Sequence, residues 1–145
     1  MNFWKNLSKP FFALAPMADV TDPAFRRIIA KYGKPDVTWT EFVSADGLCH
    51  PLGKAKLMKD LEYSETERPI IAQLFSSNPD NMRTACKLCA ELGFDGIDIN
   101  MGCPDKTIEK QGCGSAMIKT PDIAIQVINA AKQGILDAGK DIPLS

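Results

Sequence analysis

The sequence lacks the features that would place it in several specialised classes of protein. No apolar run approaches the roughly 20 residues that a membrane-spanning helix needs, so we exclude a transmembrane role. Lysine and arginine form no block, and the formal net charge is only −1, so no basic patch indicates nucleic acid or an anionic membrane. An RNA partner would have to be inferred from other residues.

Histidine is nearly absent, and the cysteines are not arranged as metal ligands. The one histidine, His50, follows Cys49 with no third or fourth ligand nearby, so we predict no metal site and give His50 no catalytic role. The five cysteines lack the paired spacing of a secreted disulfide framework. Cys86 and Cys89 form a C-x-x-C pair, but both fall on the apolar stripe of an expected helix, and we interpret them as core. These observations favour a reducing, cytoplasmic location.

What the chain does contain is a regular alternation of strand and helix patterns. Of its 145 residues, 45% are hydrophobic and 24% are charged, which is enough for one folded domain with a core. The predicted strands are 11–15, 37–42, 69–75 and 95–100, and the predicted helices are 21–33, 51–60, 78–93 and 120–136. Residues 142–145 look like the beginning of a fifth strand.

This alternation predicts an α/β fold with a parallel sheet, since parallel strands need a crossover and a helix usually supplies it. A doubly wound sheet and a (β/α)₈ TIM barrel both fit the pattern. Four units in this length predict eight in roughly 250 to 300 residues, the size of a TIM barrel, so we favour the barrel. Residues 1–145 would then be the N-terminal half of the barrel domain, with the first four β/α units and the start of strand five. The open sheet edges of such a half-barrel would favour self-association.

In a barrel of this kind, the chemistry gathers at the carboxyl ends of the strands. Side chains alternate along a strand, so Ile97 and Ile99 should face the helices while Asp98 and Asn100 point into the barrel. Gln73 and Asn100 carry carboxamides near strand ends, and a carboxamide both donates and accepts, which suits the mixed edge of a flavin or pyrimidine ring. The alternative is that both side chains bond to neighbouring backbone.

Cys103 lies in a constrained turn just beyond the fourth predicted strand. Gly102 lets the chain approach a ligand closely and Pro104 fixes the turn that follows, and reactive cysteines are found in such places. The alternative is a buried small hydrophobic residue. Residues 112–114 begin like a dinucleotide-binding motif but lack its third small residue, so we reject that function. The loop 105–114 carries two lysines and two glycines, and we expect it to fold over a bound substrate.

Four blocks of residues occur in a distinctive order and spacing. They are Ala15-Pro16-Met17-Ala18-Asp19-Val20-Thr21-Asp22, Thr40-Glu41-Phe42, Gln73-Leu74-Phe75 and Asp98-Ile99-Asn100-Met101-Gly102-Cys103-Pro104. Together they resemble the tRNA-dihydrouridine synthases, over essentially the whole chain. The run Gln111-Gly112-Cys113-Gly114-Ser115-Ala116-Met117 looks like the family's continuation of its active-site loop. Cys113 departs from the pattern, because a small residue such as alanine is expected there, and we give Cys113 no function.

The resemblance implies an FMN-dependent TIM barrel that reduces the C5–C6 bond of particular uridines in tRNA, with NADPH as the reductant. By the same resemblance, the cofactor-binding residues are Pro16, Met17, Ala18, Gln73 and Asn100, with Asn100 touching both flavin and uracil. Cys103 matches the family's catalytic cysteine. The family's later barrel strands and its C-terminal helical RNA-binding domain would lie beyond residue 145.

The chemistry of that reaction agrees with a proton donor at Cys103. Hydride transfer from reduced flavin to C6 of uracil leaves negative charge over C5, which an acid must protonate. A free thiol is mostly protonated at neutral pH yet releases its proton readily. The uracil must also leave the RNA stack, so we expect an open site that accepts a flipped nucleotide.

Two alternatives stay open. A related FMN barrel that acts on a free pyrimidine, of the dihydroorotate or dihydropyrimidine dehydrogenase type, would share the fold, the flavin and an active-site cysteine or serine. Residues 1–145 could also be an incomplete half-barrel without catalysis of its own, which associates with itself or with RNA.

Overall fold

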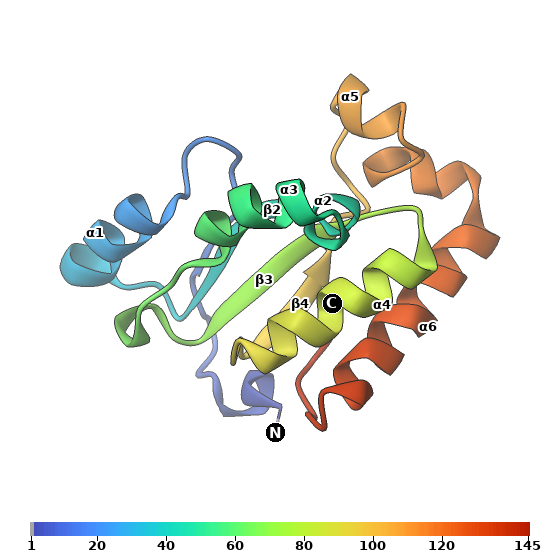
Figure 1. Ribbon diagram of the computed structural model, residues 1–145. Coiled ribbons are helices and arrows are strands. Elements are labelled where there is room, and N and C mark those ends of the chain that lie inside the picture. Colours follow the sequence, from blue (N-terminus) through green and yellow to red (C-terminus); the bar gives the residue numbers. More distant parts are fainter. Residues whose placement is uncertain (1) are drawn as a thin grey trace.

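The runs rich in β-branched and apolar residues form the strands of one parallel sheet. The computed structural model describes residues 2–145, and its strands are β1 (Ala13–Leu14), β2 (Val37–Ser44), β3 (Ile70–Phe75) and β4 (Gly96–Ile99). They lie in sequence order, and each pairs in parallel with the next (Figure 1). Leu144 forms a parallel bridge to Ile97, so the segment predicted to begin a fifth strand lies beside β4.

The order of the strands favours one of the two predicted closures. A doubly wound sheet reverses its strand order at a switch point, whereas the described sheet keeps sequence order through β4 and residue 144. The first strands of a (β/α)₈ barrel follow one another in this way. The predicted α/β class with a parallel sheet is therefore confirmed, while self-association through open sheet edges stays a prediction.

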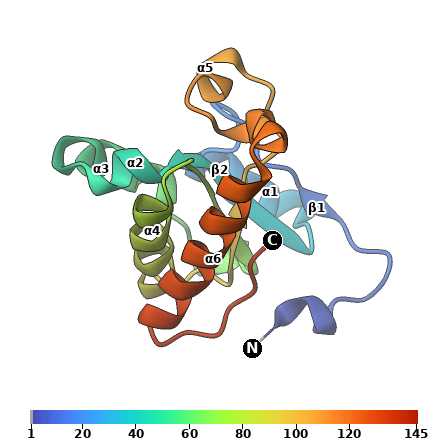
Figure 2. The same ribbon diagram turned by 90° about the vertical axis from the view of Figure 1, so that its right-hand side faces the viewer.

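Three long helices connect and cover the strands. They are α1 (Pro23–Gly33), α4 (Pro79–Glu91) and α6 (Pro121–Asp137). Asp22 and Asn78 cap α1 and α4 through their side-chain oxygens, and a proline follows each cap. Figures 1 and 2 show α4 and α6 side by side against one face of the sheet, with the 3₁₀ turn η1 (Phe3–Asn6) on the opposite side. No helix within residues 2–145 is long and apolar enough to cross a membrane.

Some predicted boundaries are wrong. β1 is shorter than 11–15, because Pro16 has no N–H to continue the ladder and Phe12 is 75% exposed instead of belonging to the core. The predicted helix 51–60 is α3 (Pro51–Leu57) followed by the 3₁₀ turn η2 (Met58–Leu61). The prediction missed α2 (Ala45–Cys49), α5 (Lys106–Glu109) and the 3₁₀ turns η3 (Glu65–Glu67) and η4 (Gly114–Lys119). These elements are short, and α2 and α5 start at local side-chain caps, Ser44 and Asp105.

The core fills the space between the sheet and helices α4 and α6. Ile97 and Ile99 are buried there, as their alternation along β4 predicts. Cys86 and Cys89 are fully buried on α4, which confirms their interpretation as core. The side chains that alternate with these lie on the opposite face of the sheet and point toward the interior of the predicted barrel. Asp98 is one of them, and it is only half-buried.

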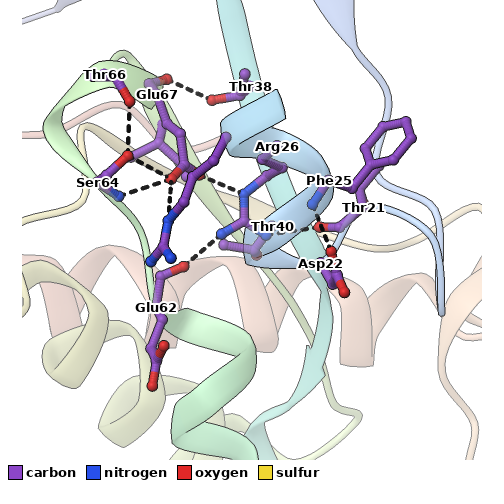
Figure 3. A network of polar contacts seen from close by, with 12 residues as sticks. Thr21, Asp22, Phe25, Arg26, Thr38, Thr40, Glu62, Ser64, Thr66 and Glu67 are labelled. Atoms are coloured by element: carbon purple, nitrogen blue, oxygen red, sulfur yellow. Dashed lines mark hydrogen bonds and ion pairs between the residues drawn. The ribbon is translucent and has the colours of Figure 1, made fainter. Parts of the chain in front are cut away.

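A buried ion pair joins α1 to the connection before β3 (Figure 3). Arg26 and Glu67 are both fully buried, and Arg26 Nε donates to Glu67 Oε2 at 2.7 Å. The other guanidinium nitrogens donate to the backbone oxygens of Thr21, at 2.7 Å, and of Glu62, at 2.5 Å. Thr38 Oγ1 of β2 donates to the backbone oxygen of Glu67 at 2.6 Å. The pair therefore fixes α1, β2 and η3 to one another.

Breaking this pair from one side should destabilise the protein strongly. Arg26→Met leaves the buried Glu67 carboxylate with only the half-exposed Arg27, 3.8 Å away, and Ser64 as partners, and we expect the free energy of unfolding, measured in urea, to fall by about 3 to 5 kcal/mol. The exposed pair of Lys87 and Glu91 provides the control, because Lys87→Met should cost no more than about 0.5 kcal/mol.

A double-mutant cycle separates the pair from its surroundings. The variant Arg26→Met/Glu67→Gln should be less destabilised than the sum of its two single variants, since neither charge is then left buried alone. Strictly additive losses, or an Arg26→Met loss no larger than that of the control, would contradict this account of the pair.

Candidate active site at the carboxyl edge of the sheet

The carboxyl ends of the strands line a cavity of about 410 Å³. Its lining contains four of the six residues predicted to bind cofactor or to act in catalysis, namely Pro16, Gln73, Asn100 and Cys103. The other lining residues are Phe42, Asp98, Ile99, Met101 and Gly102. A neighbouring cavity of about 380 Å³ shares Pro16, Gln73 and Asp98, so the two form one concave surface. Both volumes suit a small-molecule ligand.

The loop after β1 carries the other two predicted residues. Met17 and Ala18 are exposed and line neither of these cavities. The Met17 N–H donates to Thr21 Oγ1 at 3.0 Å, and the Met17 carbonyl accepts the Thr21 N–H at 3.0 Å. The backbone of Met17 is thus engaged in a turn, and Arg26 holds the end of that turn through the Thr21 carbonyl. Cofactor binding by Met17 and Ala18 stays a prediction.

Side chains in the middle of β2 contact both neighbouring segments. Asp19, in the loop after β1, has a positive φ of 58°, and its N–H donates to Glu41 Oε1 at 2.5 Å. The adjacent Thr40 accepts the backbone N–H of Gln73 at its Oγ1, at 3.1 Å. The polar residues Thr40 and Glu41 of β2 therefore set the position of the β1 loop on one side and of Gln73 on the other.

Three polar side chains form a connected chain at the ends of β3 and β4. Gln73 Nε2 donates to Asp98 Oδ2 at 2.5 Å, and Asn100 Nδ2 lies 3.4 Å from Gln73 Oε1. Asn100 Oδ1 accepts the backbone N–H of Cys103 at 3.0 Å and that of Gly102 at 3.3 Å. The alternative that the carboxamides bond to backbone is thus correct for the side-chain oxygen of Asn100. Within residues 2–145, the carboxamide of Gln73 bonds only to side chains.

The turn that carries Cys103 is held from two sides. Asn100 accepts its N–H, and the Ser115 N–H donates to its carbonyl at 2.9 Å. Gly114 packs against the same carbonyl, because a Cβ there would lie 2.4 Å from the Cys103 oxygen. The half-buried Cys103 side chain also packs on a small apolar cluster of Phe75, Ile108 and Cys113. The thiol is therefore partly packed and partly available to the cavity.

The segment after Cys103 contains α5, which stands clear of the sheet at the top of Figure 1. Asp105 caps it by accepting the N–H groups of Thr107, at 2.8 Å, and Ile108, at 3.3 Å. Closure of this loop over a substrate stays a prediction.

The other cysteines differ from Cys103 in their surroundings. Burial raises the pKa of the Cys86 thiol to about 12, and it raises the pKa of Cys89 as well. Burial also raises the pKa of Cys113 and Cys49, and the negative charge of Asp46 adds to the rise in both. Among the described residues, no group of three or more His, Cys, Asp or Glu is arranged to hold a metal ion.

Sequence reasoning misses several residues that build the site. Strand alternation places Asp98 inward, but no pattern indicates that it bonds to Gln73. Glu41 and Thr21 occur in the sequence blocks without an assigned role. Trp4 of η1 lines the second cavity beside Trp39, with ring centroids 6.1 Å apart. The alternation that locates Asp98 is the only local pattern that could have suggested any of these contacts.

The surroundings of the thiols predict an order of alkylation. At pH 8 burial and a raised pKa should keep Cys86, Cys89 and Cys113 unmodified by iodoacetamide in the native protein. Cys103 should react first, because it is half-buried and lines the cavity. Peptide mass spectrometry after timed quenching measures each site, and unfolding in urea should make all of them react. Alkylation of Cys86 or Cys89 as fast as Cys103 would show that this description of the cysteines is wrong.

Gly114→Ala should disturb the Cys103 turn. Both Gly114 and Gly139 have positive φ, of 60° and 66°, but only Gly114 has a neighbour within 4 Å of an added Cβ. Gly139→Ala therefore measures the backbone strain alone and should lower the free energy of unfolding by about 1 to 2 kcal/mol. Gly114→Ala should lower it by at least about 1 kcal/mol more, because the added methyl group overpacks the turn. The alkylation rate of Cys103 should change severalfold in Gly114→Ala only, and equal effects of the two variants would exclude this contact.

Comparison with known proteins identifies the family of this chain. A family model for dihydrouridine synthase matches residues 13–139. The chain is 47% identical to the probable tRNA-dihydrouridine synthase 2 of Bacillus subtilis (strain 168) over 133 residues, which are 92% of this chain and 41% of that relative. It is 44% identical to a probable tRNA-dihydrouridine synthase of Staphylococcus aureus (strain COL), over 92% of this chain and 40% of the relative.

A third relative, a probable tRNA-dihydrouridine synthase of Staphylococcus epidermidis (strain RP62A), is 42% identical over 92% of this chain and 41% of its own length. The chain thus spans about two fifths of the length of the curated relatives it matches. Because the family model covers most of the sequence and includes the strand ends that form the cavity, the chain belongs to the dihydrouridine synthase family.

Proposed function

We propose that the full-length protein is a flavin-dependent oxidoreductase that reduces the C5–C6 bond of particular uridines in tRNA to dihydrouridine. The observation that carries this proposal is the meeting of Pro16, Gln73, Asn100 and Cys103 around one cavity in a chain of the dihydrouridine synthase family. The names of the relatives support tRNA as the substrate. We place the protein in the cytoplasm, with tRNA and NADPH as its partners.

The proposal includes the architecture around this cavity. The sheet would be part of a (β/α)₈ barrel, with residues 1–145 supplying the N-terminal half of the barrel domain. The sequential parallel order of the strands and the position of residue 144 beside β4 support this. The remaining strands and a helical RNA-binding domain would come from the part of the full-length protein outside these residues.

FMN fits the side chains that line the cavity. Pro16, Phe42 and Ile99 offer apolar walls to a planar ring, and the carboxamides of Gln73 and Asn100 offer donors and acceptors to its polar edge. Met17 and Ala18 would add contacts from the β1 loop. When bound and reduced by NADPH, FMN supplies the hydride that C6 of the uracil receives.

Cys103 is the proposed general acid. Negative charge that develops over C5 of the uracil takes the proton from Cys103 Sγ. Asn100 presents the thiol at a fixed place by accepting the Cys103 N–H at 3.0 Å, and the open side of the cavity gives access to a nucleotide flipped out of the RNA stack. The protein's own contribution is therefore to hold the ring edge, orient the turn and donate the proton.

Cys103→Ala in the full-length protein should separate the two half-reactions. Reduction of bound flavin by NADPH, followed by flavin absorbance, should persist, while dihydrouridine formation in tRNA, measured by nucleoside mass spectrometry, should fall at least about 100-fold, as expected for loss of one positioned acid. Cys49→Ala is the matched control, since Cys49 is half-buried and lines neither cavity. Unchanged turnover of tRNA by Cys103→Ala would remove Cys103 from this role.

The rival function is reduction of a free pyrimidine by a related FMN barrel. The same protein assayed on unmodified tRNA and on free uracil or orotate distinguishes the two. We expect reduction of tRNA uridine only, and reduction of the free bases alone would overturn the proposal.

A further inference from the structure

Asp98 lies at one end of the polar chain whose other end is the Cys103 turn. Its Oδ2 accepts from Gln73 Nε2, and its Oδ1 accepts from Ser145 Oγ at 2.8 Å. Gln73 is only 8% exposed, so its carboxamide has little contact with bulk water. The hydrogen bond to Asp98 therefore determines the orientation of the Gln73 carboxamide.

The two ends of this series of hydrogen-bonded side chains fix the orientation of the two carboxamides in the same sense. A carboxylate accepts hydrogen bonds and donates none, so the group that faces Asp98 has to be the amide nitrogen of Gln73. Backbone N–H groups donate and do not accept, so the group of Asn100 that faces Gly102 and Cys103 has to be its oxygen. The nitrogen of Asn100 is then left to face the oxygen of Gln73, at 3.4 Å. Neither carboxamide can turn over without losing a partner.

This direction fixes which polar atoms remain for a ligand. Within residues 2–145, Gln73 Nε2 keeps one N–H, Gln73 Oε1 keeps one lone pair and Asn100 Nδ2 keeps one N–H without a protein partner. In the order Gln73 Nε2, Gln73 Oε1 and Asn100 Nδ2, these groups are a donor, an acceptor and a donor. All three belong to residues that line the 410 Å³ cavity. The complementary ligand edge is an N–H between two carbonyl groups.

We propose that Asp98 is a positioning residue that sets this donor, acceptor, donor order and so selects a ring whose edge carries an N–H between two carbonyls. The pyrimidine ring of a flavin and a uracil base share that edge. The inference rests on the proposed function for the identity of the ring. It assigns Asp98 a part in recognition, although the side chain acts through Gln73 and Asn100.

Asp98→Asn tests the proposal with almost no change of shape. The carboxamide that replaces the Asp98 carboxylate offers an oxygen or an amide nitrogen to Gln73 with equal ease, so this end no longer fixes the orientation of the Gln73 carboxamide. Only the 3.4 Å contact between Asn100 Nδ2 and Gln73 Oε1 then opposes its turning over, and the order of donors and acceptors is weakened. Asp98→Ala removes the acceptor and gives a second route to the same loss. Asp122→Asn, at an exposed position in the first turn of α6, is the matched control.

The readout is a ratio of two affinities: the affinity for the ligand with the central N–H, divided by the affinity for the analogue that carries a methyl group there. In the first arm, the flavin-free full-length protein is titrated with FMN and with 3-methyl-FMN, followed by flavin fluorescence. In the second, the FMN-loaded protein is titrated with tRNA that carries uridine or 3-methyluridine at the modified position. The steric cost of the methyl group is common to all variants, so a change of ratio reports the hydrogen-bond order.

We expect the ratio to fall by about three- to tenfold in Asp98→Asn and Asp98→Ala, the value of one neutral hydrogen bond, and to stay unchanged in Asp122→Asn. A fall in the first arm identifies the flavin as the ligand of this edge, and a fall in the second identifies the uracil. If the protein binds FMN and reduces tRNA but the ratios are equal in every variant and in both arms, the role of Asp98 is overturned and the proposed function is not. A wild-type protein that binds no flavin would overturn the proposed function itself.

Discussion

A guanidinium and a carboxylate taken out of water destabilise a fold unless the groups around them are satisfied. Around Arg26 and Glu67 the partners come from several segments: the backbone oxygens of Thr21 and Glu62, and the cap formed by Ser64. The pair can therefore form only when α1, β2 and η3 are correctly placed, and it holds them there. Since Thr21 is bonded in turn to Met17, this constraint reaches the loop that brings Pro16 to the cavity.

The other wall of the cavity is built by a different kind of polar contact. β3 and β4 bring Gln73, Asp98 and Asn100 to one edge of the sheet, where a carboxylate at one end and backbone N–H groups at the other order the two carboxamides. The first wall is thus positioned by a buried charge pair and the second by hydrogen bonds with a fixed direction. The cavity between them combines apolar walls with a few oriented polar atoms, which is the composition of a cofactor site.

The parts of this arrangement that could be predicted from sequence are those with a local pattern. β3 is apolar apart from Gln73 and buried throughout, so the strand pattern itself locates Gln73; the alternation in β4 locates Asn100 and the turn at Cys103. The prediction for β1 is wrong because Phe11 and Phe12 are apolar but exposed, and Pro16 ends the ladder. The contacts that organise the site join residues 41 positions apart in the Arg26 pair and 25 apart between Gln73 and Asp98. Such pairs leave no period or motif in the sequence.

We propose that these strand ends belong to an enzyme that makes dihydrouridine in tRNA. The most direct measurement compares site-resolved maps of dihydrouridine in tRNA from cells with and without the gene, and then treats the tRNA from the deleted cells with the purified full-length protein, FMN and NADPH. The account predicts that at least one position loses dihydrouridine on deletion and regains it in the treated tRNA. Identical maps with and without the gene, and no change on treatment of the tRNA, would contradict it.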